Sequence, residues 1–174
     1  MRIEQSGDPV GEVLSLTDAK LHCRASDFTD DDALIEAYVD AAVDYVQDVC
    51  QTVLLVTPFT ATGSSFDVSF NGYPNPEVTS ASYVDSLGVT ITLAADDYEI
   101  RDGRFVLLSS ADVASATLTF TAGIGAGNIP PKLAQAVRLM VAHWYANREA
   151  SGDALSPLPL GVREMVALHR SFAF

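Results

Sequence analysis

Five acidic residues recur at every fourth position of one segment: Asp32, Glu36, Asp40, Asp44 and Asp48. An α-helix turns once in about 3.6 residues, so this spacing places the carboxylates along one helix face, where like charges repel by roughly 0.2–0.5 kcal/mol per pair. Residues 29–51 contain no Lys or Arg to relieve the repulsion. The stripe is either a solvated face or a surface that meets a channel or a basic neighbour. A metal site is disfavoured, because carboxylates on one straight helix rarely converge on one ion.

A glycine-rich run, Gly123-Ile-Gly-Ala-Gly127, lies between a predicted strand and a predicted helix, as a phosphate-binding loop does. A Walker loop ends in Gly-Lys-Ser/Thr, whereas Asn128-Ile-Pro130-Pro131 follows here. The two prolines also lack the N–H groups that would bind an anion. We therefore expect no cofactor, and we expect the glycines to let the chain turn sharply from sheet to helix.

The candidates for metal binding or catalysis are few. His22, His143 and His169 form no His-x-x-x-His pair, and the chain has no Cys-x-x-Cys motif, which disfavours a zinc site. No Gly-x-Ser-x-Gly motif marks a nucleophile. A small hydrolase or ligand-binding domain built on His143 and nearby acids is one alternative, since triads are assembled in space. We expect the chain not to be an enzyme.

Two clusters combine aromatic and basic side chains, the composition of protein–protein anchors. Trp144 and Arg148 lie at the end of a predicted helix and form either a subunit interface or a core residue with a C-terminal cap. Arg170, Phe172 and Phe174 end the chain and predict docking, either on a partner or on the body of the domain.

Composition excludes several other classes. The 174 residues carry a net charge of −13 and include two lysines, which disfavours a DNA-groove or membrane-surface binder. No apolar run approaches the ~18 residues of a membrane span, and residues 1–13 lack the apolar segment of a signal peptide. We expect Cys23 and Cys50 to be reduced and buried. The charged fraction of 19% is low and favours burial against other subunits.

The elements that must position these residues follow from periodicity. Apolar residues at three- and four-residue steps predict two long helices, over 29–51 and 130–149, with core stripes of Leu34, Tyr38, Ala41, Tyr45 and Val49 and of Leu133, Val137, Met140, Val141 and Trp144. Short helices are predicted over 19–24 and 162–172. Period-two patterns predict strands over 53–60, 65–70, 78–84, 89–93, 98–101, 104–108 and 116–121.

These elements predict an α+β fold, because helices and strands are segregated along the chain. We expect a bundle of two long and two short helices, with an antiparallel β-hairpin block inserted between the long helices. Residues 1–14 are predicted to form a flexible arm, and residues 15–174 a single domain. Within it, the β-rich insertion covers about 52–122 and the C-terminal helix and tail about 162–174.

Several stretches resemble the head–tail connector, or adaptor, family of long-tailed bacteriophages. The most specific is Ile129-Pro-Pro-Lys-Leu-Ala-Gln-Ala-Val137, which runs on to Val141-Ala-His-Trp-Tyr-Ala-Asn-Arg-Glu149. The others are Leu16-Thr-Asp-Ala-Lys-Leu-His22, Asp30-Asp-Asp-Ala-Leu-Ile35, Tyr98-Glu-Ile-Arg-Asp-Gly-Arg104, Leu118-Thr-Phe-Thr-Ala-Gly123 and Pro157-Leu-Pro-Leu-Gly-Val162. Their order and spacing cover nearly the whole chain.

The resemblance implies a virion protein that forms a ring, typically of about twelve subunits, beneath the portal in the neck between capsid and tail. Its partners would be further copies, the portal protein and a downstream neck or tail-completion protein, with DNA only as passing cargo and no membrane. Before assembly we expect it in the host cytoplasm. On this view Asp40, Asp44 and Asp48 meet a neighbour's Arg138 or Arg148. A tail-completion or tail-terminator subunit is the alternative role.

Overall fold

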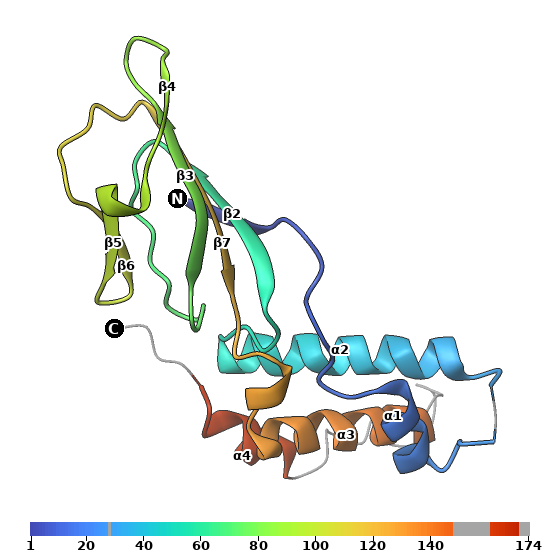
Figure 1. Ribbon diagram of the computed structural model, residues 1–174. Coiled ribbons are helices and arrows are strands. Elements are labelled where there is room, and N and C mark those ends of the chain that lie inside the picture. The colour runs from blue at the N-terminus through green and yellow to red at the C-terminus, as the bar shows by residue number, and fades with distance from the viewer. Residues whose placement is uncertain (28, 148–160, 171–174) are drawn as a thin grey trace. The chain divides into compact units, whose positions relative to one another are not determined.

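The computed structural model describes residues 1–27, 29–147 and 161–170 (Figure 1). Contacts divide the described residues into two compact units: a β unit of residues 1–10 and 55–124, and a helical unit of residues 11–27, 29–54, 125–147 and 161–170. Helices and antiparallel strands are therefore segregated, which confirms the α+β class. The predicted insertion, 52–122, corresponds to the longer segment of the β unit. A single domain over 15–174 stays a prediction.

The helical unit contains α1 (Leu16–Cys23), α2 (Asp32–Cys50), α3 (Pro131–Ala146) and α4 (Val162–Ala167), with a short 3-10 turn, η2, over Ala126–Asn128. The Ser15 side chain caps α1 by accepting a hydrogen bond from the Asp18 N–H. Pro131 opens α3, where a missing N–H costs nothing. The two long helices pack alongside each other, as the sequence predicted (Figure 1). None of the described helices combines the length and apolar character of a membrane span.

The predicted core stripe of α2 is wrong by one position, whereas that of α3 is largely confirmed. The fully buried residues of α2 are Ile35, Ala42, Val46 and Cys50, which pack with Leu133, Ala136, Val137, Met140 and Val141 of α3. The predicted residues of α2 flank this line, and the tyrosines among them are only partly buried. A tyrosine favours the edge of a core because its hydroxyl needs a polar partner or water. Trp144, the last member of the α3 stripe, is half-buried.

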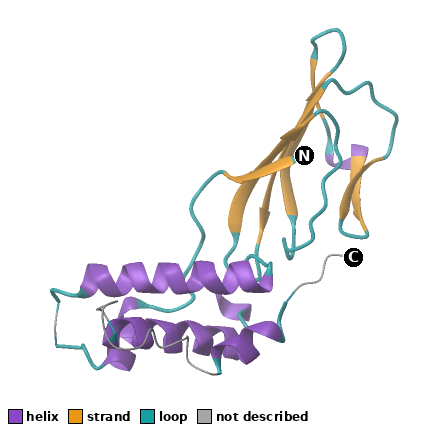
Figure 2. Cartoon of the chain, turned by 180° about the vertical axis from the view of Figure 1, so that it is seen from behind, coloured by secondary structure: helices purple, strands orange, loops and turns teal. Residues whose placement is uncertain are grey.

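The β unit contains a five-stranded antiparallel sheet with the strand order β1-β2-β7-β3-β4. Figure 2 shows the strands of this unit in orange. Its strands are β1 (Arg2–Gln5), β2 (Thr57–Gly63), β3 (Glu77–Val84), β4 (Thr90–Thr92) and β7 (Ser115–Ala122). A short 3-10 turn, η1 (Ala95–Asp97), leads into a separate hairpin of β5 (Tyr98–Arg101) and β6 (Arg104–Leu107). Phe59 stacks on the fully buried Phe120 with ring centroids 5.5 Å apart, and these rings form the core of the sheet.

Two predictions for the β unit are wrong. Residues 2–5 of the expected flexible arm form β1, because their backbone pairs with β2 from Arg2–Thr62 to Gln5–Phe59. Residues 65–70 form no strand, and β2 instead pairs with β1 and β7. Phe66, Val68 and Phe70 are nevertheless buried, and the backbone of this segment pairs with β6 through one isolated bridge, between Ser69 and Arg104. The alternating apolar pattern over 65–70 therefore reflects burial of every second side chain, although the segment is not hydrogen-bonded as a strand of a sheet.

The sharp turn predicted at Gly123 is confirmed, and a tight two-residue turn joins β5 to β6. Asp102 and Gly103 both have positive φ, 51° and 69°, as a two-residue hairpin between twisted strands requires. Gly123 has φ 155°, and a Cβ there would lie 2.2 Å from the Leu55 carbonyl oxygen. Only glycine fits where these two backbone segments approach so closely.

Candidate subunit interfaces

The acidic stripe of α2 lies on the outer face of that helix. Asp40, Asp44 and Asp48 each precede a buried residue of α2 by two positions, which is about 200° around the helix. All three are exposed, as is Glu36, and none forms an ion pair with the described residues. Within the helical unit, this face therefore points away from the core, as a solvated face or an interface would.

The acids at the start of α2 behave differently. The carboxylate of Asp32 forms an ion pair with the ammonium group of Lys20 on α1, at an N–O distance of 2.5 Å. The carboxylate of Asp31, the residue before the helix, accepts a hydrogen bond from the Tyr145 hydroxyl of α3 at 2.7 Å. These two contacts join the start of α2 to α1 and to α3.

Trp144 is half-buried within the helical unit, and its ring lies 6.1 Å from that of Tyr38, tilted by 55°. It contributes to packing between α2 and α3 and keeps part of its surface exposed. Arg148, its predicted companion, lies outside the described residues. Phe172 and Phe174 do so as well, and Arg170 is exposed after the end of α4. The docking roles of these residues stay predictions.

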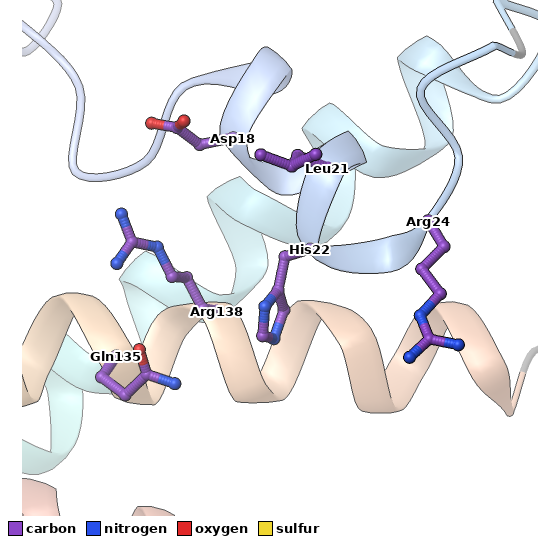
Figure 3. Close-up of a pocket in the computed structure, with 6 residues that line it drawn as sticks. All are labelled: Asp18, Leu21, His22, Arg24, Gln135 and Arg138. Carbon is purple, nitrogen blue, oxygen red and sulfur yellow. The ribbon is translucent and has the colours of Figure 1, made fainter.

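Arg138 lies on α3 and lines an open groove of about 400 Å³ between α3 and α1 (Figure 3). The other lining residues are Asp18, Leu21, His22, Arg24 and Gln135. The sequence singled out Arg138 but not His22 or Arg24 as an interface residue. The sequence shows that His22 and Arg24 lie close together at the end of α1, where Arg24 is the C-cap residue. Only the packing of α1 on α3 brings them beside Arg138.

The groups considered for catalysis lie in different parts of the helical unit. Nδ1 of His143 lies 3.4 Å from the side-chain nitrogen of Asn147, one turn further along the end of α3. Burial raises the pKa of the Cys23 and Cys50 thiols, so both are held in the unreactive protonated form. Both are free, as predicted; Cys50 is buried and Cys23 only partly so. Among the residues that the structure describes, no three His, Cys, Asp or Glu side chains converge as a metal site would require.

Comparison with known proteins gives the class of protein. A family model described as head completion protein matches residues 12–172, so the chain belongs to the head completion protein family. This confirms the predicted family resemblance. No curated protein matches the chain.

Solved structures with the same fold come from gene transfer agent (GTA) particles. A chain from the neck of an empty particle, computed with C6 symmetry, has a TM-score of 0.76 and 23% identity. Chains from the virion of a native particle and from a native neck computed with C12 symmetry have TM-scores of 0.77 and 0.74, at 23% and 22% identity. Each match covers 100% of this chain and 97% of the other.

Proposed function

We propose that this protein is a structural subunit of a phage or phage-derived particle. It forms an oligomeric ring in the neck, joins the portal vertex of the capsid to the tail, and lets DNA pass through. The family match over residues 12–172 carries this proposal. The full-length fold similarity to neck chains supports it, and so do the C6 and C12 symmetries used for those necks, which are rotational symmetries of rings. It acts in the virion neck and is in the host cytoplasm before assembly.

The charge of the chain suits a neck through which DNA slides. A net charge of −13 repels phosphates, whereas proteins that hold DNA neutralise phosphates with clustered Lys and Arg. We therefore assign the protein no catalytic step and no tight DNA binding.

Within the ring, we assign Asp40, Asp44 and Asp48 to one side of each subunit contact and Arg138 to the other. We also assign Trp144 and Arg148 to the subunit interface, as an aromatic and a basic anchor. A second set, Arg170, Phe172 and Phe174, docks on the portal protein.

The test is selective binding of the full chain to portal protein from the same particle, with the tail-tube protein as a second bait. We expect co-purification with portal, and rings at the portal vertex by electron cryomicroscopy. The double substitution Phe172→Ala and Phe174→Ala should weaken portal binding about tenfold. Leu87→Ala is the matched control, because Leu87 is 86% exposed in the β3–β4 turn of the β unit.

The outcomes separate the candidate roles. Binding to the tail-tube protein alone would favour a tail-completion or tail-terminator subunit. Binding to neither bait would overturn the neck function.

A further inference from the structure

The groove between α1 and α3 gathers positive charge on a strongly acidic chain. Four described cations, Arg2, Lys20, Arg101 and Arg104, form ion pairs within the chain. Arg24 and Arg138, which line the groove, form no ion pair with any described residue. Asp18 is the one acidic residue of the lining, so the two guanidinium groups leave a net positive surface there.

The basic side chains form a row. Figure 3 shows the imidazole of His22 between the guanidinium groups of Arg138 and Arg24, with His22 extending from α1 toward α3. Leu21 lies beside the row and is 68% exposed, which is high for a large aliphatic side chain. An exposed leucine next to unpaired cations is the composition of an interface, where an apolar contact excludes water and charges fix the register.

A matching row of opposite charge lies on another face of the same unit. The carboxylates of Asp40, Asp44 and Asp48 recur every four residues, about 6 Å apart along the axis of α2. They point away from the face of α2 that packs on the other helices, whereas the groove is formed by α1 and α3. The two rows therefore lie on different surfaces of the unit, so they do not pair with each other within one copy.

We propose that the α1–α3 groove of one copy receives the acidic outer face of α2 from a second copy. Arg24, His22 and Arg138 then lie against Asp40, Asp44 and Asp48, and Leu21 packs against the aliphatic part of that helix. Such a contact is heterologous, since it joins two different patches, and its repetition closes a ring or extends as a filament. This inference rests on the proposed ring function and names the surfaces that form it.

The charges favour a second copy over nucleic acid. A phosphate chain entering the groove approaches a molecule of net charge −13, and two guanidinium groups neutralise only a small part of that field. Compared with a phosphate chain, the carboxylate face of a helix carries fewer charges, and it holds them in a fixed row. The α2 helix of this chain supplies such a row.

Two complementary variants of the full chain test the contact. Arg24→Gln with Arg138→Gln disables the groove and keeps the acidic face, whereas Asp40→Asn, Asp44→Asn and Asp48→Asn disable the face and keep the groove. Each variant alone should self-associate at least about tenfold more weakly than the wild type. Mixed, they retain one functional copy of each surface, so they should form a 1:1 complex that does not extend.

Sedimentation velocity up to about 1 mM protein measures both results. The 1:1 complex should dissociate when NaCl is raised from about 0.05 M to about 0.5 M, because exposed charges are screened. Lys132→Gln with Arg163→Gln is the matched control, because it removes the same charge from exposed positions outside the groove.

Absence of the 1:1 complex, or equal weakening by the control, would overturn the groove assignment. The proposed function is judged separately by portal binding. If the groove variant still forms rings on portal, the groove assignment fails and the neck function stands. If it keeps self-association but loses portal binding, the groove is a portal site and this proposal is wrong.

Discussion

The two ends of the acidic run on α2 look alike in sequence and differ in the folded protein. At the start of the helix, Asp32 meets Lys20, and Asp31 just before it meets Tyr145. Further along, Asp40, Asp44 and Asp48 are exposed and form no ion pair with the described residues. Equal spacing thus places carboxylates on a helix, but the neighbouring helices determine which of them stabilise the unit and which remain for a partner.

Among the substitutions that test this comparison, Lys20→Met is expected to have the largest effect on stability. The Lys20 side chain is 11% exposed and that of Asp32 is 32% exposed, so removing the cation leaves a carboxylate with little solvent to replace it. We expect a loss of about 2 kcal/mol in the free energy of unfolding, between the values for surface and fully buried pairs. Urea denaturation of dilute protein measures it.

Lys132→Met is the control for Lys20→Met, because Lys132 is exposed on α3 and should change stability by less than about 0.5 kcal/mol. Equal effects of the two substitutions would contradict an anchoring role for Lys20.

A smaller effect is expected from Tyr145→Phe, which deletes the hydroxyl that donates to Asp31. The loss should be about 1.5 kcal/mol, at the lower end of the range for a hydrogen bond to a charged group, because this contact is only partly buried. A double-mutant cycle with Asp31→Asn isolates the contact, since both changes together should cost little more than the larger single one. Additive losses would mean that the two side chains act independently.

The smallest effect on stability is expected at the exposed end of α2. There, Asp44→Lys turns the repulsion between residue 44 and each of Asp40 and Asp48 into an attraction. The free energy of unfolding of the monomer should rise by about 0.5 kcal/mol, while assembly weakens. Urea denaturation and sedimentation of the same sample measure both quantities. A less stable monomer that assembles normally would reverse the comparison between the two ends of α2.

Local signals allowed much of the fold to be predicted from the sequence. The α3 stripe and the sharp turn at the glycines before α3 each depend on neighbouring residues and are found in the structure. The α2 stripe was misplaced because apolar residues cover a wide arc of that helix, so periodicity alone left two adjacent lines to choose from. The pairing of β1 with β2 joins residues far apart in sequence, and no local pattern encodes it.

The candidate interface could also be predicted only in part, because one of its two surfaces is local in sequence and the other is not. The acidic face lies on a single helix, so its spacing defines it. The basic groove combines side chains of α1 and α3, and only the tertiary packing brings Arg24 to the same surface as Arg138. Arg148, Phe172 and Phe174 lie outside the described residues, and their roles stay predictions.

Strand β1 has a practical consequence for handling the protein. Residues 2–5 cover one edge of β2, and the Met1 ammonium group donates to the Asp67 carbonyl oxygen at 3.3 Å. Trimming these residues would uncover a row of N–H and C=O groups that can template strand addition from another molecule. An affinity tag fused before Met1 would also remove the charge that makes this contact. Preparations altered at this end would thus be prone to sticking edge to edge, an artefact easily mistaken for genuine neck assembly.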